Sequence, residues 1–124
     1  MFVDSHCHIN FEGLAERLPE VLANMREQQV THALCVSVDL ETLPAVLDIA
    51  ERHDNVFASV GVHPDHEDVK EPTLAELVEL AAHPKVVAIG ETGSTTTGSA
   101  SARLPTWSGS ASGFAPTSAP RARP

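Results

Sequence analysis

Apolar residues in the first ninety positions follow two alternating patterns. Continuous apolar, largely β-branched runs occur at 33–38 (ALCVSV), 56–62 (VFASVGV) and 86–90 (VVAIG), and a shorter one at 2–4 (FVD). Such runs are typical of strands that are buried on both faces of a parallel sheet. Between them, apolar residues recur three and four positions apart, which predicts amphipathic helices.

Three such helical segments separate the four strands. The first covers 14–27, with one apolar stripe and Pro19 beginning or kinking the helix. The second runs from a cap at Asp39 or Thr42 to about His53, and the third begins at a capping box formed by Thr73 and Glu76. The predicted inward residues of the first two helices are Leu14, Leu18, Val21, Leu22, Met25, Leu43, Val46, Leu47 and Ala50.

The resulting order of elements is strand–helix repeated, which predicts an α/β fold with a parallel sheet and right-handed crossovers. About four such units are present. Four units leave an edge of the sheet unpaired, so we expect an interrupted fold rather than a closed one.

The composition changes at residue 93. All 17 acidic residues and all seven histidines lie in 1–93, where only five Lys or Arg oppose them, giving a net charge of −12. Residues 94–124 consist mostly of Ser, Thr, Ala, Gly, Pro and Arg. We therefore divide the chain into a domain at 1–93 and a low-complexity, disordered tail at 94–124. The acidic domain argues against broad electrostatic binding to DNA, although a bound divalent metal would reverse the local field.

Cys7 and Cys35 are the two cysteines, and both lie in apolar runs. We expect no signal peptide, since the first residues show neither a basic start nor a sustained apolar run, and no apolar run is long enough to span a bilayer. We expect a cytoplasmic protein with buried free thiols, without a membrane association or an evident protein partner, and monomeric. A disulfide between the two cysteines is the less favoured alternative.

The motif DSHCHIN places His6 and His8 directly after the first predicted strand. In an extended backbone, alternate side chains point the same way, so both imidazoles face one side and Cys7 faces the other. Two imidazoles at the carboxyl end of a barrel strand can bind one divalent ion. The alternative is a pair of ordinary, partly exposed histidines.

His63 and Glu91 follow the third and fourth predicted strands in the same way. His63 could contact a substrate phosphate or orient a water, and otherwise it is a loop histidine beside Pro64. Glu91 lies between two glycines, and its two oxygens could be shared by two metal ions; the alternative is a solvated carboxylate.

The remaining candidates are given no chemical role. Cys7 is predicted to pack in the core, and Asp4 to support the site without binding a metal. His53 is expected to cap the carbonyls of the preceding helix. No chemistry is predicted for a set of four histidines, His32, His53, His66 and His83.

The motifs FVDSHCHIN, ASVGVHP and VVAIGETG resemble, in order and spacing, those of the TatD family of metal-dependent deoxyribonucleases, which are amidohydrolase-like TIM barrels. The resemblance covers residues 1–93, the N-terminal half of such a barrel. It implies that His6 and His8 bind one divalent metal and that Glu91 bridges it to a second. It also implies hydrolysis of DNA phosphodiester bonds with Mg²⁺, or with Mn²⁺ or Zn²⁺.

Two alternatives remain beside the nuclease interpretation. Other amidohydrolase-like enzymes act on small amides or phosphoesters, often with a modified lysine after the fourth strand, where this chain has Glu91. The chain could also be non-catalytic or merely bind a metal. We expect weak or no activity, because no His, Asp or Glu occurs after residue 93 and the later ligands of the family have no counterpart.

The tail departs from the family where Ser-Thr-Thr-Thr replaces the expected Leu-Asp-Tyr-Tyr after Gly93. The nucleotides GGCCTCGACTACTACCGG encode Gly-Leu-Asp-Tyr-Tyr-Arg, and loss of one C gives Gly-Ser-Thr-Thr-Thr-Gly, as observed. A flexible linker has no second domain to join, and three arginines are sparse for a nucleic-acid arm. We therefore interpret the tail as shifted reading frame and the domain as truncated.

Overall fold

The computed structural model describes residues 1–64 and 69–92. Four strands alternate with three helices, and a short 3₁₀ turn, η1, precedes the first helix. The strands are β1 (Phe2–Cys7), β2 (Val30–Cys35), β3 (Val56–Val60) and β4 (Val86–Ile89). The helical elements are η1 (Ala15–Arg17), α1 (Leu18–Glu27), α2 (Leu43–Arg52) and α3 (Leu74–Ala81). The predicted α/β order is confirmed.

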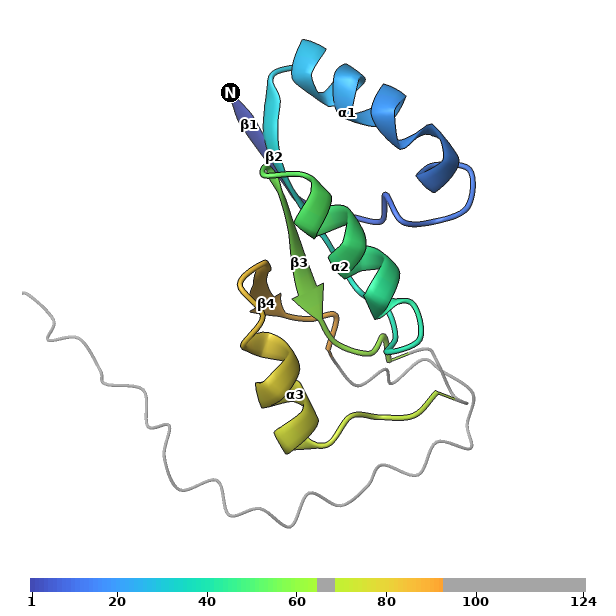
Figure 1. Ribbon diagram of the computed structural model, residues 1–124, viewed down its shortest axis with the longest axis vertical. Helices are drawn as coiled ribbons and strands as arrows, with labels where there is room; N and C mark the ends of the chain where they lie inside the picture. Colours follow the sequence, from blue (N-terminus) through green and yellow to red (C-terminus); the bar gives the residue numbers. More distant parts are fainter. Residues whose placement is uncertain (65–68, 93–124) are drawn as a thin grey trace, which may run out of the picture.

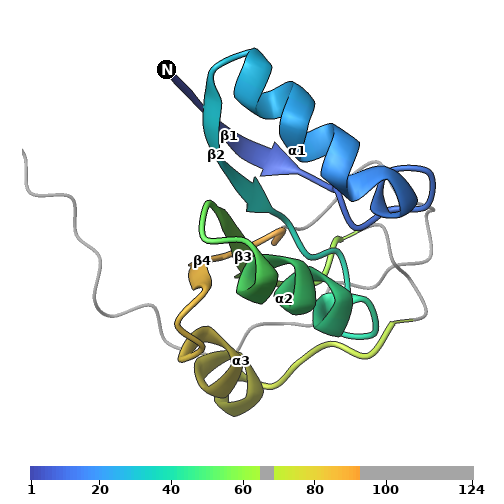
Figure 2. The same ribbon diagram turned by 45° about the horizontal axis from the view of Figure 1, so that its top comes forward.

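The strands form one parallel sheet in the order β1-β2-β3-β4, with every neighbour joined through a helical crossover. The three helices lie on one side of the sheet in both views (Figures 1 and 2). This arrangement is that of consecutive units of a (β/α)₈ barrel, in which the helices form the outer layer.

The strand limits differ from the sequence predictions, most of all for the first two strands, while β3 and β4 end at Val60 and Ile89 and not at the predicted 62 and 90. The first strand runs to Cys7 rather than ending at residue 4, so that His6 lies within β1 and not after it. The second begins at Val30, the partner of Phe2, and ends at Cys35 instead of covering 33–38. Val36 and Ser37 are buried outside the ladder, so their apolar or small character reflects burial rather than strand pairing.

The helix α1 is also shorter than predicted, because η1 takes the first turn of the expected segment. Pro19 lies in the first turn of α1. The N–H groups of a first turn have no partner within the helix, so the missing N–H of proline costs no hydrogen bond there. Leu18, Val21 and Leu22 pack against the core as expected, whereas Leu14 lies before the helix and is exposed.

The caps of the other two helices follow the predictions in part. Thr73 and Glu76 form the expected capping box at the start of α3. Thr42 occupies the N-cap of α2, but its side chain makes no capping hydrogen bond to the helix. The Asp39 carboxylate accepts hydrogen bonds from the Thr42 N–H and hydroxyl, at 2.6 and 2.7 Å. Both candidates therefore contribute to the start of α2, through a bond between them.

The core lies between the sheet and the helices and is centred on α2 and β3. Val46, Ala50, Val56 and Ala58 have no exposed surface, and Cys35 joins them from β2. Completely burying a valine side chain contributes roughly 1.5–3 kcal/mol, so this small cluster is the main source of stability. The two edge strands are much more exposed than this core. Four of their apolar residues are more than half exposed: Phe2 and Val3 of β1, and Val87 and Ile89 of β4.

Within residues 1–64 and 69–92, no helix has the length and apolar character needed to cross a bilayer. The predicted disorder of the 94–124 tail, the reading-frame hypothesis and the role of His66 fall on residues outside the described part.

Candidate metal centre

The structure brings together three residues of the predicted metal site, His6, His8 and Glu91. His6 is near the end of β1, His8 follows that strand, and Glu91 follows β4. One ligand atom from each lies within 4.8 Å of the other two. Although β1 and β4 are opposite edges of the sheet, side chains at their carboxyl ends meet in this cluster.

His8 is held by two interactions. Its Nδ1 lies 3.0 Å from the carbonyl oxygen of Val36, and because that oxygen can only accept, Nδ1 carries the hydrogen. The neutral ring then keeps the lone pair on Nε2, which is the form that binds a metal. The ring of Phe11 stacks on the imidazole, with centroids 4.7 Å apart and planes inclined by 17°.

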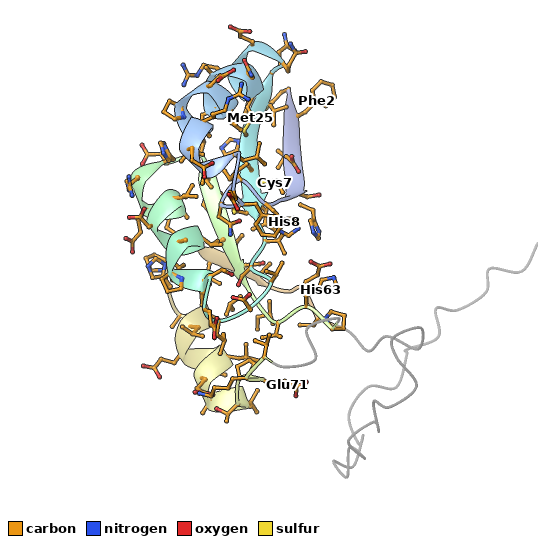
Figure 3. The ribbon with its side chains drawn as sticks, turned by 90° about the vertical axis from the view of Figure 1, so that its right-hand side faces the viewer. Phe2, Cys7, His8, Met25, His63 and Glu71 are labelled. Atoms are coloured by element: carbon orange, nitrogen blue, oxygen red, sulfur yellow. The ribbon has the colours of Figure 1, made fainter. Side chains whose placement is uncertain are left out.

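Glu91 lies between two histidines, one on each side of its carboxylate. His6 Nε2 is 3.6 Å from Oε2, and His63 Nε2 is 3.3 Å from Oε1. The two oxygens of Glu91 thus face different partners, and His63 is brought beside the predicted metal ligands. Figure 3 shows His8 and His63 on the same flank of the molecule, away from the helices.

The backbone that carries Glu91 is fixed to β3 and to the loop after β2. Gly90 N–H donates to the Val60 carbonyl at 2.9 Å, and the Ser59 hydroxyl donates to the Gly90 carbonyl at 2.8 Å. The Ser37 N–H donates to the same Ser59 hydroxyl oxygen at 3.3 Å. Ser37 and Ser59 are the buried polar residues of the described chain, and both serve to hold the peptide from which Glu91 projects.

The donor set suits a divalent cation. Two imidazole nitrogens with a carboxylate oxygen are ligands for Zn²⁺ and Mn²⁺, and the carboxylate also suits Mg²⁺. The ligand atoms lie within 4.8 Å of one another, about 0.6 Å more than twice a typical metal–ligand bond of about 2.1 Å, and side-chain rotation can close this gap. The side chain of His6 is half exposed, so it is free to adjust.

The other sequence candidates lie as follows. Asp4 accepts the His6 backbone N–H at 3.0 Å, a contact to the site without a ligand role. The Cys7 thiol donates to the Leu34 carbonyl and packs against the core, as predicted. Two further histidines pair elsewhere, His32 with the Thr31 hydroxyl and His83 with the Glu51 carboxylate.

His53 occupies the C-cap of α2 in an extended backbone conformation, and no bond from its imidazole to the last carbonyls of the helix is seen. The described structure therefore does not show the predicted capping of the helix carbonyls by the His53 side chain. Its backbone carbonyl instead accepts from the ammonium of Lys85.

Sequence reasoning missed Ser59 and Phe11. Ser59 stands inside an apolar run, and a polar residue at such a position was the available signal of a buried hydrogen bond. Phe11 follows the H-x-H motif in a loop, where nothing in the sequence announces a stack on His8.

The chain is similar to known proteins over most of its length. The family model of TatD related DNase matches residues 3–102. The metal-dependent hydrolase YabD of Bacillus subtilis is 38% identical over 94 residues, which are 75% of this chain and 37% of that protein. The metal-dependent hydrolase YcfH of Escherichia coli K12 is 39% identical over 98 residues, covering 73% of this chain and 35% of that protein.

A solved structure agrees with these matches. The crystal structure of YjjV, a TatD homologue from Escherichia coli K12, superposes with a TM-score of 0.62 at 26% identity, covering 73% of this chain and 36% of that one. The chain therefore spans little more than a third of the length of the proteins that it matches.

Proposed function

Since this chain belongs to the family of TatD-related DNases, we propose that its metal centre serves the hydrolysis of phosphodiester bonds in DNA. The observation that supports this most directly is the convergence of His6, His8 and Glu91 from opposite edges of the sheet. The relatives are metal-dependent hydrolases, so a divalent cation is the cofactor for which these side chains are arranged.

Each residue of the cluster has its own task. His6 and His8 hold the cation through imidazole nitrogens, and His8 is oriented by the Val36 carbonyl. Glu91 offers one oxygen on the side of His6 and the other on the side of His63, which is the disposition that a bridge between two ions requires. When bound, two ions would activate a water and stabilise the leaving oxygen.

His63 is placed to act on the substrate or its water. Its Nε2 lies 3.3 Å from Glu91 Oε1, and its backbone N–H donates to the Val38 carbonyl at 2.7 Å. The backbone bond fixes the loop, so the imidazole is held at the edge of the cluster. There it can donate a proton to a phosphate oxygen or orient the attacking water.

Many enzymes of the rival amidohydrolase-like class use a modified lysine beside the metal cluster, and the described residues do not offer one there. Lys85 lies at the opposite, amino end of β4. Its ammonium donates to the carbonyls of His53 and Asp54 and lies 4.5 Å from the centroid of the Phe57 ring. We therefore favour the nuclease-like function over an amidase that bridges its metals with a modified lysine.

This chain on its own is expected to hydrolyse DNA slowly. It offers three protein ligands in the described cluster, and it contains no His, Asp or Glu after Glu91. An incomplete ligand set weakens both metal affinity and geometry. The alternative that this leaves is a chain that binds a metal without catalysis.

Plasmid nicking with Mn²⁺, with Mg²⁺ and with a chelator tests the proposal. We expect slow, metal-dependent nicking that is lost in the double variant His6→Ala/His8→Ala and retained in His32→Ala, which changes an exposed histidine outside the cluster. Nicking that is equal in the wild type and the double variant would contradict the proposed site. Metal binding without any nicking would favour the non-catalytic alternative, and rapid nicking would contradict the expected slow turnover.

A further inference from the structure

The ring of Phe11 is partly exposed beside the metal centre. One face stacks on the His8 imidazole at a centroid separation of 4.7 Å, and the residue still exposes 43% of its surface. Large apolar side chains exposed next to a reactive site are candidates for contacts with a ligand.

The loop fixes the backbone that carries this ring, and the stack on His8 orients the ring itself. Phe11 N–H donates to the His8 carbonyl at 3.1 Å, and the Phe11 carbonyl accepts from the N–H groups of Leu14 and Ala15 at 3.0 and 2.9 Å. Both backbone polar groups of Phe11 are therefore used in the turn. A ring held in this way loses little conformational freedom when a ligand stacks on it, which favours binding.

We propose that Phe11 is a stacking site for a nucleobase of a single-stranded DNA segment whose phosphate lies at the metal centre. This inference rests on the proposed function and adds to it the form of the substrate. Because Phe11 stacks on His8 and His8 belongs to the cluster, a base placed on the outer face of the ring is next to a phosphate held at the cluster.

The chemistry of the surroundings favours a base over other partners. Among the described residues, the cluster and its neighbours present imidazoles and carboxylates but no Lys or Arg to bind a phosphate backbone broadly. Affinity for a strand must then come from the metal and from stacking. Bases in an intact duplex have their faces covered by neighbouring bases, whereas an unpaired base has a face free for an aromatic side chain.

The experiment compares two labelled probes by fluorescence anisotropy in the presence of Mn²⁺: a short oligothymidylate and an abasic strand with the same number of phosphates. The full chain is used as wild type, Phe11→Ala and Phe11→Trp. Calorimetric Mn²⁺ titration of each variant separates an effect on the cation from an effect on the base.

We expect the wild type to bind oligothymidylate more tightly than the abasic strand by about 5- to 150-fold, the range set by a base stacked on one aromatic side chain. Phe11→Ala should remove this preference and Phe11→Trp should restore it, with Mn²⁺ affinity changed little in both. Equal binding of the two probes by the wild type would overturn the proposal. So would a Phe11→Ala variant that loses Mn²⁺ affinity and weakens both probes alike, since Phe11 would then only position His8.

The proposed function fails separately in the same experiment. If His6→Ala/His8→Ala binds both probes as the wild type does, the cluster does not hold the phosphate, whatever the result at Phe11. That outcome would remove the premise, whereas the preceding ones concern the ring alone.

Discussion

Gly61 lies directly against the backbone of Gly90. A Cβ placed on Gly61 would stand 2.5 Å from the carbonyl carbon of Gly90 and 2.8 Å from the nitrogen of Glu91. These neighbours are main-chain atoms, which cannot rotate away as a flexible side chain would. In contrast, a Cβ on Gly90 would meet nothing within 4 Å. The absence of a side chain at Gly61 is thus what allows the end of β4 to carry Glu91 toward the histidines.

Replacing this glycine is expected to damage the metal centre without touching a ligand. Gly61→Ala should force the Gly90–Glu91 peptide outward, lowering divalent metal affinity by about 10–100-fold, the effect typical of residues that support a ligand. Overpacking should also destabilise the fold by about 1–3 kcal/mol. Calorimetric titration with Mn²⁺ measures the first effect and denaturant unfolding the second. Gly90→Ala is the matched control, and equal losses in the two variants would contradict the steric explanation.

Ser59 is expected to stabilise the same peptide through its hydroxyl. Ser59→Ala would leave the Gly90 carbonyl and the Ser37 N–H without the partner they have in the wild type. Leaving buried polar groups unpaired costs about 1–3 kcal/mol, which urea unfolding would detect. Ser5→Ala on the exposed strand β1 provides the control and should change stability little. A Ser59→Ala variant as stable as that control would show that the hydrogen bonds at Gly90 are not needed.

The two cysteines are expected to react slowly as free thiols in the folded protein. Cys7 and Cys35 are register partners on adjacent strands, and Cys35 has no exposed surface. A hydrogen bond with Cys35, and then burial, raises the pKa of the Cys7 thiol well above its usual range, so it stays protonated at neutral pH. Mass spectrometry after iodoacetamide treatment should find almost no native labelling and two labels in denaturant. Rapid native labelling of Cys7 would contradict its place in the core.

The start of α3 is expected to lose stability in acid. A hydrogen bond from Lys70, followed by those at Thr73, lowers the pKa of the Glu76 carboxyl from 4.5 to about 2. A carboxyl with a lowered folded-state pKa stabilises the protein above its unfolded value, and this contribution is lost as the pH falls from about 4.5 toward 2. The stability difference between wild type and Glu76→Gln should therefore shrink over that window. A difference that stays constant with pH would exclude this role of the carboxylate.

Much of the fold was predictable from the sequence because apolar periodicity directly reflects burial. The runs at 33–38 and 56–62 indicated buried strands, and the capping box at Thr73 and Glu76 marked the start of α3 correctly. The predicted limits of the second strand were wrong, since Val36 and Ser37 are buried although β2 ends at Cys35. A hydrophobic pattern indicates that a residue is buried, but it does not indicate whether the backbone of that residue is paired in a strand.

The candidate site could be predicted only as a set of residues at strand ends. Alternation placed His6 and His8 on one side, and the parallel order brought Glu91 to the same edge. The orientation of His8 by Val36 and Phe11 depends on contacts between segments distant in the sequence or in a loop, which no local pattern specifies. The same holds for the close approach of Gly61 to Gly90. The metal-binding role of the three residues stays a prediction.

Calorimetric titration with Mn²⁺ tests this central prediction most directly. The wild type, the double variant His6→Ala/His8→Ala and the single variant Glu91→Gln should be compared with the control His32→Ala. We predict that the wild type and the control bind Mn²⁺ alike and that the cluster variants lose at least about tenfold in affinity, as expected for the removal of direct ligands. Unchanged Mn²⁺ affinity in the cluster variants would contradict the assignment of His6, His8 and Glu91 as a metal centre.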